Sequence, residues 1–179
     1  MIEDQFIELI EPALQQAGST FQGGEEFRQP PLDVLRYYRR TVQMGRIPVL
    51  GKAQSVVLVA RQPVDIDGTR PSYERFLTRL AMAVNGRFPP WKGLTIGLNA
   101  LVLTPEPIAL GDDDMLRGAL GIKLRRMRVV PLGLYRINLG QEAMALAMHT
   151  DPSGAFTEGG LLAELLCERF RRFVPLIEM

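Results

Sequence analysis

The chain has 179 residues, of which 46% are hydrophobic and 23% are charged, with a formal net charge of +1. These fractions are typical of a globular protein and argue against disorder, and a chain of this length can bury about 70% of its extended surface. A net charge this close to zero gives no long-range attraction for a polyanion, so nucleic acid is not an expected partner. We expect one globular domain over residues 1–179.

Several features of the sequence bear on the cell compartment. No apolar run reaches the roughly 20 residues that cross a bilayer, and Glu3 and Asp4 stand where a secretory signal would be basic. Cys167 is the single cysteine, so no intramolecular disulfide can form. Among the 21 basic residues three are lysines, and the dominance of arginine is typical of GC-rich bacterial genomes. We therefore expect a cytoplasmic bacterial protein that makes no contact with membranes.

The first 45 residues carry two patterns typical of helices. Apolar residues at helical spacing predict a first helix over residues 2–18, interrupted by Pro12 and ended by a glycine. The pair Pro30-Pro31 predicts the start of a second helix that ends near Gly45. Its apolar face would hold Val34, Leu35, Tyr38 and Val42, and its basic face Arg36, Arg39 and Arg40. Residues 1–45 are thus expected to form an N-terminal helical pair.

The middle of the chain alternates between buried strands and helices. The continuous apolar run at residues 55–60 predicts a strand covered on both faces, at the centre of a sheet. A helical stripe then follows, with Thr69 or Ser72 as N-cap and Gly86 as terminator. It consists of Tyr73, Phe76, Leu77, Leu80, Ala83 and Val84. A second buried strand is expected at Thr95 to Leu103, before a short helix that begins near Asp112.

The last third of the chain predicts two strands and a helix. The strands, at Val129 to Asn138 and Ala143 to His149, are joined by a turn at Gly140 and should pair antiparallel. The final helix, at Gly160 to Val174, would turn Leu162, Leu166, Phe170 and Phe173 inward. Strands that alternate with helices favour a single mixed sheet flanked by helices, of the α/β class, with α+β as the alternative.

Two segments of the chain resemble each other. Residues 51–66 and 93–108 have equal length, and each runs from a glycine through an apolar strand to a proline and an isoleucine before a helix. This pattern suggests a duplicated strand–helix unit.

Familiar catalytic and cofactor motifs are missing. The single histidine, His149, ends a predicted strand without a Gly-x-Ser-x-Gly elbow, and we interpret it as a polar residue at a strand end. Cys167 is expected to be a small core residue of the last helix. One cysteine and one histidine cannot form a usual zinc site. Gly51-Lys52 lacks the hydroxyl residue and preceding strand of a phosphate loop, and no Gly-x-Gly-x-x-Gly occurs. We expect no cofactor.

Three groups of arginines could form a phosphate-binding face. They are Arg36, Arg39 and Arg40; Arg125, Arg126 and Arg128; and Arg169, Arg171 and Arg172. Glutamates one turn away make the last group an exposed, ion-paired face. We interpret the other two as solvated surface, with a partner protein and nucleic acid as the alternatives.

Acidic residues form the one candidate catalytic site. Asp65 and Asp67 follow the first buried strand, Glu106 follows the second, and Asp112 to Asp114 open the short helix. If the strands are parallel, their carboxyl ends share the edge of the sheet where α/β folds bind ligands. Carboxylates gathered there could hold Mg²⁺ for phosphoryl chemistry. We prefer the structural interpretation, in which Asp67-Gly68 is a turn and the aspartates at 112–114 cap a helix.

Two functional hypotheses follow from the sequence. The first is a non-catalytic module that binds another protein or its own copy, because the chain has a full core and no chemical signature. The apolar tail at residues 174–177 motivates a homodimer, which would cover it. The second is a metal-dependent hydrolase or nuclease with Asp65, Asp67 and Glu106 as its catalytic residues.

Overall fold

The computed structural model describes residues 1–24, 27, 31–43, 52–88, 94–125, 127–150 and 154–173. Its elements follow one another as α1 (Glu3–Gln16), β1 (Thr20–Gly23), β2 (Asp33–Gln43), β3 (Lys52–Arg61), α2 (Arg70–Arg87), β4 (Thr95–Leu103), α3 (Asp112–Leu120), β5 (Val129–Asn138), β6 (Ala143–Met148), α4 (Glu158–Arg169) and β7 (Arg171–Arg172). None of the helices in the described ranges has the length and apolar character that a membrane crossing requires.

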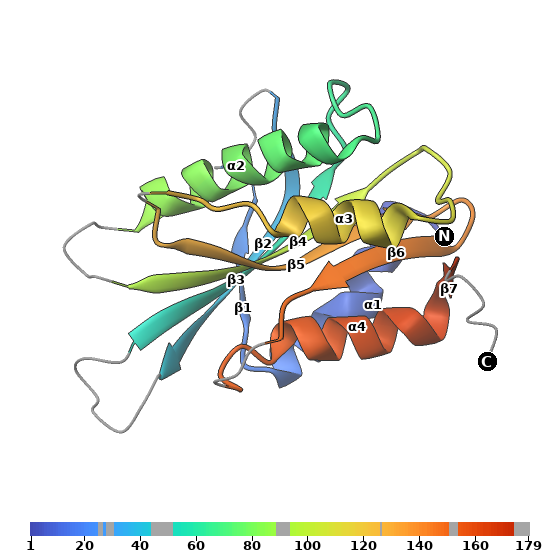
Figure 1. Ribbon diagram of the computed structural model, residues 1–179. Coiled ribbons are helices and arrows are strands. Elements are labelled where there is room, and N and C mark those ends of the chain that lie inside the picture. Colours follow the sequence, from blue (N-terminus) through green and yellow to red (C-terminus); the bar gives the residue numbers. More distant parts are fainter. Residues whose placement is uncertain are drawn as a thin grey trace, which may run out of the picture.

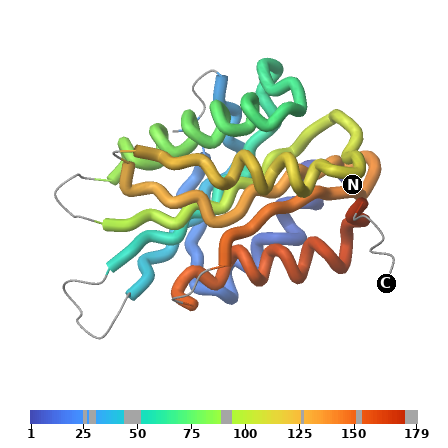
Figure 2. The backbone as a smooth tube through the Cα atoms, in the orientation of Figure 1, coloured from blue at the N-terminus to red at the C-terminus, as the bar shows by residue number. Residues whose placement is uncertain are grey.

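The seven strands form one mixed sheet in which the spatial order is the chain order, from β1 to β7. β3, β4 and β5 run parallel at the centre, whereas β1–β2, β2–β3 and β5–β6 are antiparallel pairs. Helices α2 and α3 lie on one face of the sheet, and α1 and α4 lie on the other (Figures 1 and 2). The predicted α/β class, the mixed sheet flanked by helices and the antiparallel final pair are confirmed.

Burial on both faces explains the central strands. In β3 eight consecutive residues are buried, because alternate side chains enter two different cores. Val56 and Leu58 pack with α2, and Val57 and Val59 pack with α1 and α4. β4 pairs with β3 in a register that sets Thr95 beside Ala53. These two are equivalent positions of the similar segments that the sequence contains, so the segments lie side by side in the sheet.

The predicted second helix is wrong, because Asp33–Gln43 is strand β2. A β-bulge shifts the pairing between Val34 and Arg36. Val34 and Tyr37 therefore face the core beneath α2, and Leu35 and Tyr38 face the opposite core. Two adjacent apolar pairs three residues apart imitate a helical stripe, although the aromatic and β-branched composition suits a strand. The N-terminal helical pair over residues 1–45 is thus reduced to α1 followed by two strands.

The arginines of β2 also differ from the expected basic helix face. The guanidinium group of Arg36 lies over the ring of Phe21, 5.7 Å from its centroid, and that of Arg39 lies 5.9 Å from the centroid of Phe88. Because each cation stacks on an aromatic ring, these side chains cover apolar surface.

The last helix begins and ends earlier than predicted. It ends at Arg169, and Phe170 takes an extended conformation that leads into β7. Phe170 is buried as expected, but Phe173 lies beyond the helix and is exposed. Cys167 is also exposed, because the buried stripe of α4 runs through Leu162 and Leu166 and passes it by. The predicted burial of Cys167 and Phe173 was wrong.

Leu80 tests the packing of α2 against the sheet. It is fully buried on the stripe that the sequence predicted, whereas Met82 on the same helix is 59% exposed. We expect Leu80→Ala to lower the free energy of unfolding by about 2–5 kcal/mol, the usual cost of emptying a leucine site in a core. Met82→Ala is the matched control and should change it by less than about 0.5 kcal/mol. Chemical denaturation measures both, and equal losses would contradict this placement of α2.

Candidate functional site

The loops that carry the predicted acidic residues do meet. β3 and β4 are parallel, so their carboxyl ends lie at the same edge of the sheet. A methyl group at Gly68 would lie only 3.6 Å from Oε2 of Glu106. The loop after β3 and the loop after β4 are therefore in contact, as the parallel pairing required.

The acidic side chains at this edge nevertheless have partners within the chain. Asp65 forms an ion pair with Arg79. Asp67 accepts hydrogen bonds from the hydroxyl of Thr69 at 2.7 Å and from its backbone N–H at 3.2 Å. These bonds, the hydroxyl first, lower the pKa of Asp67 to about 2. Among the described residues, no group of three or more His, Cys, Asp or Glu side chains is arranged to hold a metal ion.

A buried arginine organises the rest of this edge. Arg136 of β5 is 5% exposed and donates to Oε2 of Glu106 at 2.8 Å and to Oδ2 of Asp112 at 2.6 Å. Asp113 accepts from Arg172 at 2.6 Å and from the backbone N–H of Leu146 at 2.7 Å. The carboxylates that open α3 therefore anchor this helix to β5, β6 and β7.

Metal binding at this edge can be tested directly. We expect calorimetric titration of the wild type with Mg²⁺ and Mn²⁺ to give no stoichiometric heat, and replacement of both Asp65 and Asp67 by Asn to change nothing. The reason is that a divalent site needs several oxygen ligands held together, whereas these two carboxylates are engaged with Arg79 and Thr69. A stoichiometric heat that the double variant abolishes while keeping its fold would instead support the hydrolase or nuclease hypothesis.

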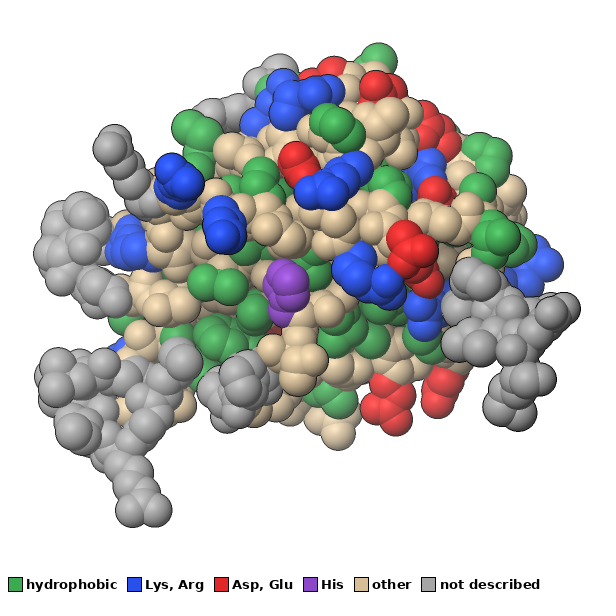
Figure 3. Space-filling model, viewed as in Figure 1, with side chains coloured by type: hydrophobic (Ala, Val, Ile, Leu, Met, Phe, Trp, Pro, Cys, Tyr) green, Lys and Arg blue, Asp and Glu red, His purple; other side chains and the backbone are tan. Residues whose placement is uncertain are grey.

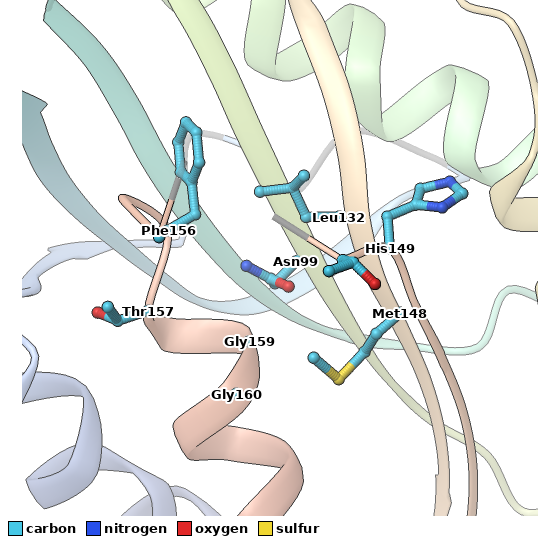
Figure 4. Close-up of a pocket in the computed structure, with 10 residues that line it drawn as sticks. Asn99, Leu132, Met148, His149, Phe156, Thr157, Gly159 and Gly160 are labelled. Atoms are coloured by element: carbon cyan, nitrogen blue, oxygen red, sulfur yellow. The ribbon is translucent and has the colours of Figure 1, made fainter. Parts of the chain in front are cut away.

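A cavity of about 370 Å³ lies elsewhere in the molecule, and none of the predicted site residues Asp65, Asp67 and Glu106 lines it. It opens between strands β4 to β6 and the first turn of α4 (Figure 4). Its walls include Leu132, Met148 and Phe156, together with Gly159 and Gly160 of α4. The walls are thus mainly apolar, and backbone is exposed at one end.

Asn99 is the unusual side chain of this cavity. It lies on β4 and is 1% exposed, yet neither Oδ1 nor Nδ2 has a hydrogen-bond partner within the part of the chain that the structure describes. Figure 4 shows its side chain in the middle of the lining residues, between Leu132, Phe156 and the start of α4. A buried amide without partners costs about 1–3 kcal/mol. Such a group calls for a specific explanation, and a bound molecule is one.

Glycines make room for this amide and enclose one of its atoms. A methyl group at Gly133 would lie 2.5 Å from Oδ1 of Asn99, and one at Gly159 would lie 2.9 Å from the same atom. A methyl group at Gly97 would lie 2.5 Å from Leu132 and 2.7 Å from Phe156. Oδ1 is thus the amide atom that lies against these two glycines, and the other atom is Nδ2. In Figure 4 it points toward the side of Phe156.

The first turn of α4 adds further donors. The first α-helical hydrogen bond runs from the N–H of Leu161 to the carbonyl of Thr157, at 3.2 Å. The N–H groups of Gly159 and Gly160 precede it and thus have no partner within the helix. They point out of the helix end, and a methyl group at Gly160 would meet no atom within 4 Å. This end of the cavity carries the partial positive charge of a helix N-terminus.

A buried ion pair sets the position of this helix end. Glu158, the first residue of α4, is fully buried and accepts hydrogen bonds from Arg40 at 2.6 and 2.9 Å and from the Ser19 hydroxyl at 3.0 Å. Burial, the largest single influence, raises the pKa of Glu158, but the hydrogen bonds to its carboxylate, those from Arg40 first, together with the charge of Arg40 outweigh burial, so the pKa lies below its usual value. The carboxylate is therefore charged, compensated and turned toward β2.

The candidate base His149 and the candidate nucleophile Cys167 do not face the amide of Asn99. Nε2 of His149 lies 3.3 Å from the carbonyl oxygen of Leu120, and Figure 4 shows the ring pointing away from Asn99. The histidine is exposed on the surface beside hydrophobic side chains (Figure 3). Cys167 is also exposed, farther along α4. A signal for the cavity was nevertheless present in the sequence, as a polar residue and glycines inside apolar segments.

Comparison with protein-family models, with curated proteins and with solved structures finds no match for this chain. The chemistry of the side chains described above is therefore the basis for assigning a function.

The ion pair at the start of α4 should contribute more to the free energy of unfolding than an exposed ion pair of similar geometry. We expect Arg40→Met to lower the free energy of unfolding by about 3–5 kcal/mol, because it leaves the buried Glu158 carboxylate uncompensated. Arg61→Met is the matched control. It removes two ion pairs of an arginine that is 49% exposed, and it should cost less than about 1 kcal/mol.

The ion pair between Arg40 and Glu158 predicts that the free energy of unfolding depends on pH. The pKa of Glu158 is lower in the folded chain than in the unfolded chain, so its contribution to stability is complete above about pH 4.5. It is lost as the pH falls through the folded pKa. Denaturation of the wild type from pH 7 downward should show this loss. In Arg40→Met the lost pairing raises the folded pKa, so the loss of stability on acidification should be smaller. An equally steep loss in both proteins would contradict the assignment.

Proposed function

We propose that this chain is a non-catalytic binding module and that its binding site is the cavity around Asn99. The observation that carries the proposal is the buried amide of Asn99, both of whose polar atoms lack a partner among the described residues. Buried polar groups in proteins are almost always hydrogen-bonded, and exceptions concentrate where a ligand or an ordered water supplies the missing partner.

The dimensions and walls of the cavity suit a small molecule or the end of a larger one. Its volume of about 370 Å³ falls within the usual range of ligand pockets, roughly 300–1,000 Å³. Such pockets combine apolar walls with a few polar groups that fix orientation. Leu132, Met148 and Phe156 provide the walls, while Asn99 and the start of α4 provide the polar groups.

The composition of the walls supports binding in preference to catalysis. Of the described residues that line the cavity, His149 is the one titratable side chain, and its ring is turned away from Asn99. Acid–base or nucleophilic catalysis needs a base or nucleophile within hydrogen-bond reach of the reacting atoms. Amides, by contrast, hold and orient a ligand without reacting with it.

A protein partner is compatible with this site, because the end of a polypeptide can enter a cavity of this size. Self-association through the tail at residues 174–177 stays a separate prediction, because that tail lies outside the described residues. Sedimentation at micromolar concentration, with and without residues 175–179, tests it. The metal-dependent hydrolase or nuclease is the alternative function, and the calorimetric titration above decides it.

A stability measurement tests whether Asn99 serves binding or folding. We expect Asn99→Leu, which keeps the shape of the side chain, to raise the free energy of unfolding by about 1–3 kcal/mol, since it removes a buried polar group without partners. Asn138→Leu is the matched control. Its amide donates to the carbonyls of Pro105 and Glu106 and accepts from the N–H of Gln141, so its loss should destabilise the chain.

The comparison of these two variants by chemical denaturation is decisive. If Asn99→Leu destabilises the chain as strongly as Asn138→Leu, then the Asn99 amide supports the fold, and the proposed binding function is wrong.

A further inference from the structure

We infer that the cavity binds a carboxylate group carried on a short, branched apolar body. This inference rests on the proposed function and adds the class of ligand to it. Either a free short-chain carboxylic acid or the C-terminal residue of a polypeptide presents this chemistry.

The cavity offers hydrogen-bond donors at Asn99 and at the start of α4, and the hydroxyls of Thr150 and Thr157 in its lining can donate as well. Oδ1 of Asn99, the acceptor of its amide, is enclosed by the backbone at Gly133 and Gly159. Nδ2 offers two hydrogens, and the N–H groups of Gly159 and Gly160 offer two more from the end of α4. A complementary group must therefore consist of acceptors, and the two oxygens of a carboxylate supply up to four acceptor sites.

The electrostatics of α4 favour an anion over a neutral carbonyl. A helix N-terminus carries about half a positive charge and attracts carboxylates and phosphates. Among the described residues, the carboxylate of Glu158 adjoins this helix end, but it accepts two hydrogen bonds from Arg40 and does not line the cavity. Its charge is compensated within the protein, so it does not cancel the attraction at the helix end.

We expect the ligand to carry a single negative charge. No lysine or arginine stands among the described residues that line the cavity. Desolvation of a phosphate, which carries nearly two charges, is costly without such a cation. A carboxylate bears one charge and can satisfy its lone pairs with the amide and helix donors, as in charge-assisted hydrogen bonds to backbone N–H groups.

The walls define the rest of the ligand. Leu132, Met148 and Phe156 present apolar side chains around the polar end. Each methylene group buried against them contributes about 0.8 kcal/mol. A branched aliphatic group of three or four carbons, such as that of a valine or leucine residue, therefore suits the walls.

The experiment uses three probes on the full chain: isovalerate, isovaleramide, and N-acetyl-L-valine. The first two have the same shape and differ in charge, and the third presents the carboxylate as a polypeptide end does. We expect protein-observed NMR titration to show isovalerate binding at least tenfold more tightly than isovaleramide. Tighter binding of N-acetyl-L-valine would identify a polypeptide end as the source, and weaker binding would identify a free acid.

Two pairs of variants locate the binding. Asn99→Leu should weaken isovalerate binding at least tenfold, while Arg61→Met, a surface change, should leave it unaltered. Gly160→Pro removes one helix N–H in the first turn, where proline is tolerated, and should also weaken it. Gly160→Ala keeps that N–H and serves as the matched control. Because the proline variant tests the donors independently, the inference stays open to refutation even if Asn99→Leu fails to fold.

The outcomes distinguish a failure of the carboxylate inference from a failure of the proposed binding function. Equal or tighter binding of isovaleramide, or preferential binding of inorganic phosphate, would overturn the carboxylate while retaining the cavity as a binding site. Absence of binding by all three probes at millimolar concentration, together with destabilisation in Asn99→Leu, would overturn both.

Discussion

The ion pair between Arg40 and Glu158 joins parts of the chain that are far apart in the sequence. Arg40 belongs to β2 and Glu158 opens α4, while Ser19, just beyond α1, donates to the same carboxylate. Arg40 also donates to the carbonyl of Ala155, in the segment that enters α4. A buried charge without its partner is strongly unfavourable, so these elements are held in one arrangement. The first turn of α4 consequently meets the sheet beside Asn99.

The surroundings of Asn99 combine closely packed glycines with an unpaired buried amide. The close approach of Gly133 and Gly159 removes side chains that would otherwise fill the core around the amide, and the amide itself remains unpaired. A leucine side chain, which is similar in shape to asparagine, carries no polar group that must be desolvated. Natural proteins keep such features where binding requires them, because stability and function compete at these sites. Among the described residues, Ser55 Oγ on β3 and Arg136 Nε on β5 are also buried without a partner, but each is a single atom, whereas Asn99 has two.

At the carboxyl edge of the sheet, in contrast to Asn99, the polar side chains are paired within the protein. Its position is the one at which α/β folds usually bind ligands, and the loops after β3 and β4 do meet there. However, Arg136 is buried between Glu106 and Asp112, and Arg79 pairs with Asp65. These carboxylates form ion pairs, which hold α2 and α3 against their neighbours. The acidic residues at this edge are therefore better explained by structure than by catalysis.

The sequence by itself determined the centre of the fold, because burial on both faces demands unbroken apolar strands, as at residues 55–60, and burial on one face demands a helical stripe, as in α2. It misassigned β2, where a bulge breaks the alternation by which a strand is recognised. Only the tertiary structure revealed the cavity. Asn99, Gly133 and Gly159 come from three elements, and their contact depends on strand register and on the docking of α4. Local sequence patterns encode which faces are buried, but they carry no information about which distant residues those faces meet.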